Sequence, residues 1–140
     1  MRRASTASRP ESRNLSAATT LAWTDGEDTS TGEPVRRIPP LNGSLRVRYL
    51  PSSRLWFEAA TLVADRQDEL SSGDIEDPRI GPDGTPGYTV FNLGAGYSPT
   101  PNQQVLVTLE NLGDKTYKTH GSGIFSPGRS VAVTYRVGFE

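Results

Sequence analysis

The sequence predicts an all-β protein whose antiparallel strands cross a membrane as a segment of a β-barrel. Three observations support this prediction. Apolar and polar residues alternate along several segments, these segments have the length of a membrane-crossing strand, and short connections alternate with long ones. No run of about 18 apolar residues occurs, which excludes a transmembrane helix. The 140 residues carry a formal net charge of -1, which argues against nucleic-acid binding.

The N-terminal residues are basic and rich in small side chains. Residues 1–13 contain Arg2, Arg3 and Arg9 among Ser, Thr and Ala residues, without the apolar stretch of a secretory signal peptide. This composition predicts a disordered N-terminal tail over residues 1–13. The β-rich part is therefore expected over residues 14–140.

The first half of that part contains three segments in which apolar residues recur at every second position. They cover residues 14–24, 42–50 and 54–65. The repeating side chains are Leu15, Ala17, Thr19, Leu21 and Trp23, then Leu45, Val47 and Tyr49, then Leu55, Phe57, Ala59, Thr61 and Val63. Because successive side chains of a strand point to opposite faces, each segment is predicted to be a strand with one apolar face.

The second half contains three further segments of the same kind. They cover residues 88–97, 103–111 and 130–139. Their repeating side chains are Phe91, Leu93, Ala95 and Tyr97, then Val105, Val107 and Leu109, then Val131, Val133, Tyr135, Val137 and Phe139. About six strands are therefore predicted, each long enough to cross a bilayer at a tilt.

The connections between the predicted strands alternate in length. Residues 50–54 and 98–102 are short turns rich in Pro and Ser, whereas residues 25–41, 66–87 and 113–129 are long and polar. A bacterial outer-membrane barrel has short periplasmic turns and long extracellular loops. A soluble antiparallel domain has no reason to keep all its long loops at one end.

Charged and aromatic side chains occupy separate positions in these strands. The charged or strongly polar residues all fall on the face opposite the apolar one: Arg46, Arg48, Glu58, Asn92, Gln104, Glu110 and Arg136. The aromatic residues gather near strand ends, with Tyr49, Phe57, Tyr97 and Phe139 at the short-turn end and Trp23 and Phe91 at the other. A basic residue facing lipid at mid-membrane would cost about 2–4 kcal/mol, and aromatic girdles are typical of membrane interfaces.

A second interpretation is a soluble β-sandwich or jelly-roll module that binds a glycan or a partner through its long loops. It would require the apolar faces of the strands to pack on each other. It accounts for the number of strands, but not for the alternation of short and long connections.

Short motifs at the strand ends carry a family resemblance. They are Arg37-Ile38-Pro39-Pro40, Gly84-Thr85-Pro86-Gly87-Tyr88, Glu110-Asn111-Leu112-Gly113-Asp114-Lys115-Thr116-Tyr117, Pro127-Gly128-Arg129-Ser130 and a last alternating strand that ends at Phe139. With these motifs the chain resembles the C-terminal β-barrel segment of TonB-dependent outer-membrane receptors. The resemblance covers residues 14–140 and is most specific near the C-terminus.

The resemblance implies about six strands of a larger barrel of about 22, with no plug domain within these residues. It implies active uptake of a scarce nutrient, such as a ferric siderophore or heme, across the cell outer membrane. The expected partners are outer-membrane lipid, the barrel assembly machinery, a plug domain with the remaining barrel strands and, indirectly, the TonB complex. Because about six strands cannot close a barrel, we expect a fragment of a receptor.

Three residues are candidates for function under this resemblance. His120 and Tyr117 lie in an extracellular loop and are candidate ligand contacts, while the aromatic Phe139 is a candidate signal for barrel assembly. A solvated surface His is the plainer interpretation of His120. We expect no enzymatic activity, no catalytic or metal-binding residue and no cofactor.

Two further patterns in the loops invite a chemical interpretation. His120-Gly121-Ser122-Gly123 is similar to an oxyanion loop of esterases, but neither a nucleophile elbow nor a second His accompanies it. A group of carboxylates could bind calcium, although its spacing does not match an EF-hand, and a solvated loop is the favoured interpretation. This group consists of Asp65, Asp68, Glu69, Asp74, Glu76, Asp77 and Asp83.

Overall fold

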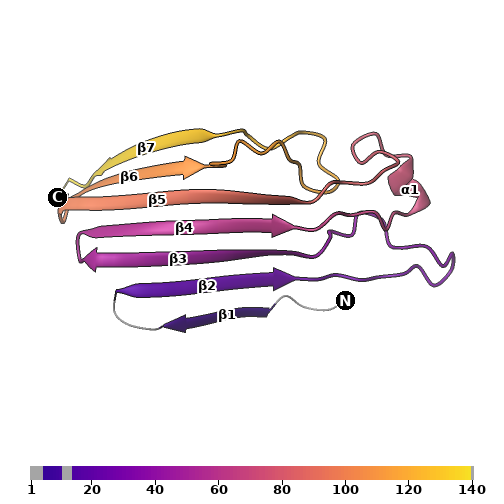
Figure 1. Ribbon diagram of the computed structural model, residues 1–140, viewed down its shortest axis with the longest axis horizontal. Helices are drawn as coiled ribbons and strands as arrows, with labels where there is room; N and C mark the ends of the chain where they lie inside the picture. Colours follow the sequence, from indigo (N-terminus) through magenta and orange to yellow (C-terminus); the bar gives the residue numbers. More distant parts are fainter. Residues whose placement is uncertain (1–4, 11–13, 140) are drawn as a thin grey trace.

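The structure is a single antiparallel sheet whose strands follow one another in chain order (Figure 1). The computed structural model describes residues 5–10 and 14–139. The strands are β1 (Ser5–Pro10), β2 (Leu15–Ala22), β3 (Asn42–Ser52), β4 (Leu55–Ala64), β5 (Tyr88–Thr100), β6 (Gln103–Glu110) and β7 (Ser130–Val137), and the helix α1 is Ser72–Ile75. Within the described residues, no helix is long and apolar enough to cross a membrane.

All six predicted strands are present as β2 to β7, and the predicted fold class is confirmed. Two strands continue further than predicted, β3 to Ser52 and β5 to Thr100. In both, the register with the next strand shifts beside the short turn, at Tyr49/Ser52 and at Tyr97/Thr100. Pro51 and Pro99 lie in these intervals and cannot donate to a ladder, so the pairing becomes irregular there.

The last strand ends earlier than predicted. β7 ends at Val137, and Phe139 lies beyond it and is 92% exposed. The partner strand explains this difference, since Gln103 is the first residue of β6 and pairs with Val137. Among the described residues one further backbone bond continues the pairing, from Gly138 N–H to the carbonyl of Asn102 at 2.8 Å.

Part of the segment that was predicted as an N-terminal tail, residues 1–13, lies in the sheet. Residues 5–10 form β1, which pairs with β2 so that Ser5 lies opposite Leu21 and Pro10 opposite Ser16. The edge of β2 offers unpaired N–H and C=O groups, and a segment without apolar alternation can satisfy them through its backbone alone. The other residues of the predicted tail lie outside the described residues.

The register places the apolar side chains of neighbouring strands on one shared face. Val47 lies opposite Ala59, Leu93 opposite Leu109, and Val107 opposite Val133. The charged residues predicted on the opposite parity share the other face, where for example Arg48 lies opposite Glu58. We refer to the two sides of the sheet as the apolar face and the polar face.

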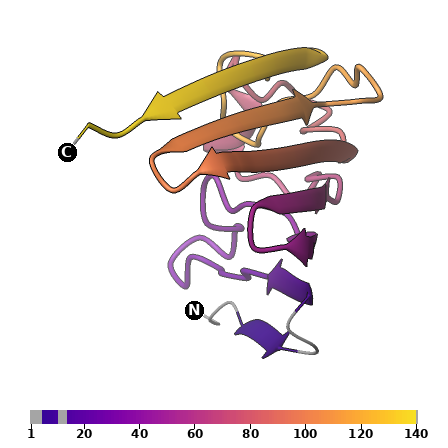
Figure 2. The same ribbon diagram turned by 90° about the vertical axis from the view of Figure 1, so that its left-hand side faces the viewer.

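Nothing in the described part of the chain covers the apolar face. Of the described apolar side chains only Ile80 and Val90 are buried, while those of the apolar face are all at least partly exposed, up to 68% at Val133. Figure 2 shows one twisted layer with β1 and β7 at its two edges. The described residues therefore do not form the soluble sandwich, because a sandwich needs a second layer against which the first can bury its apolar side chains.

The long and short connections lie at opposite ends of the sheet, as predicted (Figure 1). The long ones cover residues 23–41, 65–87 and 111–129, and only residues 53–54 and 101–102 remain in the short turns. All three long loops are therefore neighbours in space.

A charge on the apolar face should prevent insertion into a membrane. We expect Val133→Arg to cost about 2–4 kcal/mol, because a desolvated guanidinium would face lipid. The measurement is the fraction of protein that inserts into the membrane when the chain is produced together with the rest of its barrel, read from heat-modifiable gel mobility and protease protection. The control is Thr134→Arg, one residue away on the polar face, which should insert as the unmodified chain does. Equal losses for both variants would contradict the assignment of the two faces.

Candidate functional site in the long loops

The three long loops fold together into one body, which we call the loop cap (residues 23–41, 65–87 and 111–129). Isolated pairs of strand-like residues shape the first two loops, Glu27 with Pro34 and Gln67 with Thr85. The Gln67 side chain also donates to the carbonyl of Ile38 at 2.7 Å and so joins the second loop to the first. The cap therefore has fixed internal contacts between loops.

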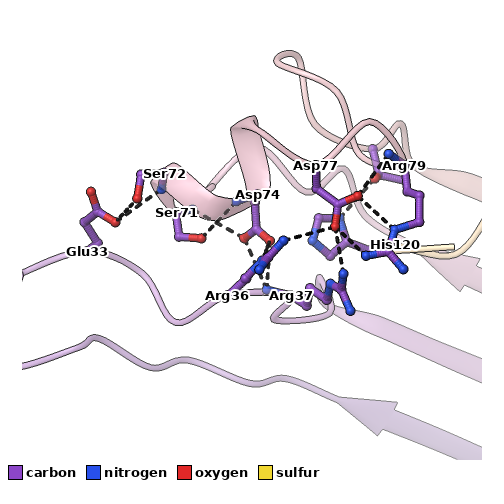
Figure 3. A network of polar contacts seen from close by, with 10 residues as sticks. Glu33, Arg36, Arg37, Ser71, Ser72, Asp74, Asp77, Arg79 and His120 are labelled. Atoms are coloured by element: carbon purple, nitrogen blue, oxygen red, sulfur yellow. Dashed lines mark hydrogen bonds and ion pairs between the residues drawn. The ribbon is translucent and has the colours of Figure 1, made fainter. Parts of the chain in front are cut away.

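Asp77 is the centre of the strongest cluster of charges in the cap (Figure 3). Its buried Oδ2 accepts from Arg36 Nη2 at 3.3 Å, Arg37 Nη2 at 2.8 Å and Arg79 Nη2 at 2.7 Å. Its Oδ1 accepts from Arg79 Nε at 2.8 Å. Since Arg36 and Arg37 belong to the first loop and Asp77 to the second, one carboxylate joins two loops.

Asp74 makes a second connection beside the first. It is buried at position N3 of α1 and forms a capping box with Ser71. Both of its carboxylate oxygens accept from the backbone N–H of Arg37, at 3.2 and 3.1 Å. Arg37 has φ 58, a conformation that costs energy for a non-glycine residue, and this hydrogen bond stabilises it. Burial by itself would raise the pKa of Asp74, but the bonds from Arg37 and Ser71 outweigh it and hold the pKa below its usual value.

These contacts correct the favoured interpretation of the carboxylate group. Asp74 and Asp77 are not solvated: they are buried and paired with arginines and backbone N–H groups. Calcium binding finds no support either, since no group of three or more His, Asp or Glu side chains in the described part could hold a metal ion. Arginines occupy the positions that a cation would take.

Glycines let the arginine side chains lie close to the backbone. Arg36 lies against Gly73 in α1, where a Cβ would stand 3.2 Å from its Nε. Arg37 lies near Gly121, and Arg79 lies against Gly123, where a Cβ would stand 3.4 Å from its Cγ and Cδ. Through the two glycines of the motif His120-Gly121-Ser122-Gly123, the third loop packs against the arginine cluster. The resemblance of that motif to an oxyanion loop has no counterpart in these contacts.

His120 lies where the second and third loops meet. Its Nδ1 is 3.0 Å from the Oγ1 of the buried Thr85, and its Nε2 is buried with no hydrogen-bond partner in the described part of the chain. The predicted solvated surface His is therefore wrong. Burial lowers the pKa of His120; Lys118 and Arg37 lower it further, while Asp74 and Asp77 oppose them.

A cavity of about 260 Å³ separates His120 from the ends of β4 and β5. Leu62 and Tyr88 line it from the sheet, and Thr85, Lys118 and His120 line it from the loops. Tyr117, the other candidate ligand contact, packs behind Tyr88 with 4.4 Å between ring centroids. The structure therefore brings His120 to a cavity and places Tyr117 in support of its wall.

Asn111 organises the third loop, a role that the sequence did not predict. It is buried, and its side chain donates to the carbonyls of Lys115 at 2.9 Å and Pro127 at 3.1 Å while accepting from the N–H of Lys115 at 2.8 Å. It has φ 50, which Asn tolerates better than most residues. The motif over residues 110–117 and the motif over residues 127–130 are thus two halves of one turn.

Phe139 lies at the other end of the sheet from the loop cap. It lines a shallow pocket of about 460 Å³ together with Gln104, Arg136 and the turn residues Pro101 and Asn102. Its exposed ring is available to another molecule. The structure therefore separates the three candidate residues into a loop site and a site at the short-turn end.

Comparisons with known proteins agree with this architecture. The sequence model of the family described as "TonB dependent receptor-like, beta-barrel" matches residues 6–112, more than half of the chain. Among curated proteins, none matches. Among the solved structures that match, the "Copper transporter OprC" has a TM-score of 0.83 and 22% sequence identity over 96% of this chain. The chain spans 23% of the OprC chain.

The chain belongs to the family of TonB-dependent receptor β-barrels, and it is an outer-membrane protein. The sheet is a segment of the barrel wall, and the likeness to OprC shows the same fold. Its apolar face therefore meets lipid and its polar face lines the barrel interior.

Removing the carboxylate of Asp77 should loosen the loop cap. We expect Asp77→Asn to weaken closure of the second loop by about 1–3 kcal/mol, because three half-exposed arginines lose a charged acceptor. The readout is hydrogen exchange at the amides of Ile80 and Gly81, which bond to the Asp77 carbonyl. The control is Asp68→Asn, which breaks only the exposed pair with Arg66 and should leave exchange unchanged.

Acid should open the third loop. The pKa of His120 in the closed cap is lower than its ordinary value of 6.5. Above pH 6.5 both closed and open forms are neutral and closure is fully stable. As the pH falls below that value, His120 of the open form takes up a proton before His120 of the closed form does. The free energy that favours the closed loop therefore decreases until the pH passes the lowered pKa. The protection factor against hydrogen exchange at the Ser122 amide, which donates to the Thr119 carbonyl, should fall over this window. His120→Gln should remove this pH dependence, and an unchanged profile in that variant would contradict the assignment.

Proposed function

We propose that the chain forms part of an outer-membrane transporter that actively takes up a scarce nutrient such as a ferric siderophore or heme. The observation that carries this proposal is the match of residues 6–112 to the TonB-dependent receptor β-barrel family. The loop cap supports it, because a set of outward loops with fixed mutual contacts can hold a ligand-binding surface in place. The chain supplies one part of the barrel wall and three of its loops.

The proposed partners follow from the unpaired edges of the sheet. β1 and β7 each leave a row of backbone groups without partners in the described sheet, and in lipid such groups cost several kcal/mol each. Further barrel strands, a plug domain inside the barrel and, indirectly, the TonB complex would complete the transporter. We also propose that the barrel assembly machinery binds the exposed ring of Phe139.

His120 is the proposed contact for cargo, with Tyr117 in a supporting role. The cavity beside His120 opens among loop residues, and Lys118 adds a cationic group to its lining. Tyr117 would act through Tyr88, whose position depends on the packing of the two rings. A contact of this kind would orient cargo at the outer mouth of the barrel.

Copper is a second candidate cargo. It is suggested by the name of OprC, the structure that this chain resembles in fold. Imidazole is a good copper ligand, and His120 is the only His of the chain, which contains no Cys. The other ligands would have to come from outside the described residues.

Uptake by cells tests the proposal and identifies the cargo. The coding sequence of the chain is deleted, and uptake of radioactive iron from several siderophores, of heme and of copper is compared with the parent strain. We expect loss of one cargo and retention of the others, with the same loss in a strain that lacks TonB. Unchanged uptake of every cargo would overturn the proposal.

A point variant tests the cargo contact separately. His120→Ala should reduce the apparent affinity for that cargo by about tenfold, the loss expected from one contact of about 1.4 kcal/mol. The amount of receptor in the outer membrane is measured in parallel. Lys115→Ala, in the same loop, is the control, since only the backbone of Lys115 takes part in the contacts of Asn111.

A further inference from the structure

The polar face carries a second charged cluster, in the middle of strands β3 and β4. Arg46 and Arg48 on β3 flank Glu58 on the adjacent strand β4. Arg48 Nε donates to Glu58 Oε2 at 3.0 Å, and Arg46 Nε lies 3.4 Å from Glu58 Oε1. Each carboxylate oxygen thus faces one arginine, and the two arginines are held in fixed positions on either side of it.

An aromatic ring fixes Arg48 from another side. The Cζ of its guanidinium lies 4.2 Å from the centroid of Trp56. The indole in turn lies over Gly96 of β5, where a Cβ would overlap the ring. Gly96 therefore makes room for Trp56, and Trp56 holds the plane of Arg48. An arginine oriented by both a carboxylate and an aromatic ring loses little further entropy when it binds a ligand.

The two arginines carry more positive charge and more N–H donors than Glu58 can pair with. Glu58 neutralises only one of the two arginines, and within the described residues the Nη groups of both have no acceptor. The Arg46 side chain is 65% exposed and that of Arg48 is 43% exposed, whereas that of Glu58 is 19% exposed. The surplus is one positive charge on the polar face, carried by two partly exposed guanidinium groups.

We propose that Arg46 and Arg48 form a carboxylate-binding site on the inner wall of the barrel. A planar monoanion would neutralise the surplus charge and accept two parallel hydrogen bonds from the fork of Arg48. The carboxylate can belong to an Asp or Glu side chain of a polypeptide held inside the barrel or to a free carboxylate that passes through it. The site depends on the polar face lining the barrel interior and is independent of the cargo proposed above.

Trp56 provides a direct readout of binding. The chain is refolded in detergent micelles rather than in a bilayer, because its edge strands β1 and β7 lack partners in the described sheet, and its strand content is verified by circular dichroism. In a Trp23→Phe background Trp56 is the single tryptophan, since the chain contains two. We expect a saturable change in its fluorescence with an N-acetylated, amidated Ala-Glu-Ala peptide or with acetate, and none with the matching Ala-Gln-Ala peptide.

Substitutions at Arg48 separate a carboxylate site from general attraction. Arg48→Gln should weaken binding at least tenfold, and Arg48→Lys should do nearly the same, because Lys keeps the charge but loses the fork. Arg54→Gln, which removes one positive charge from the nearby β3–β4 turn, should leave the affinity unchanged. Titration calorimetry provides the same comparison without relying on the altered surroundings of Trp56.

The relative affinities of the two ligands identify the occupant of the site. Tighter binding of the glutamyl peptide than of acetate would identify a polypeptide side chain as the occupant, and the reverse order would identify a free carboxylate. Equal affinity in the unmodified chain and Arg48→Gln, equal binding of the Gln peptide, or no saturable response would overturn the proposal. Loss of nutrient uptake would not bear on it, because none of these measurements involves transport.

Discussion

A backbone surrounded by lipid must satisfy all its N–H and C=O groups within the protein, and the rest of this structure depends on that constraint. Neighbouring strands meet it by antiparallel pairing in chain order. The pairing then determines which side chains meet lipid, because a slip of one residue would exchange the two faces. Such a slip would move Arg46, Arg48 and Glu58 into lipid, so the charges on the polar face stabilise the observed register against its alternatives.

Outside the membrane the long loops must be ordered without an apolar core. The long loops are too polar to bury an apolar core, and they are ordered by carboxylates that each accept several hydrogen bonds. Asp77 receives three arginines and Asp74 a capping box and the N–H of Arg37. Removing these carboxylates from water is costly, and the number of donors that converge on each offsets the cost. The cap thus acts as one body, although its loops come from three separate hairpins.

The sequence predicted the strands well and the loop cap poorly, for one physical reason. Strand alternation is a local pattern, and β2 to β7 lie close to the predicted ranges. The contacts of Asp77 join residues as far as 41 positions apart, and no local pattern indicates which carboxylates will find arginines. A loop rich in Asp and Glu therefore looked solvated. β1 was missed because edge pairing uses the backbone, and Asn111 because its contacts join two motifs that are distant in sequence.

The two arginine clusters show how similar side chains come to differ in what they can bind. In the cap, the shared carboxylate is buried, Arg79 uses two of its nitrogens on Asp77, and glycine backbones lie against the stems. Those arginines are committed to holding loops together. On the wall, Glu58 faces the Nε atom of each arginine, and both arginine side chains are more exposed than the carboxylate that they share. Arg48 shares its acceptor with Arg46, and its guanidinium lies on the indole of Trp56. It is therefore held in place and still has N–H groups that can bind a ligand, a combination that an ion pair with a structural role alone does not need.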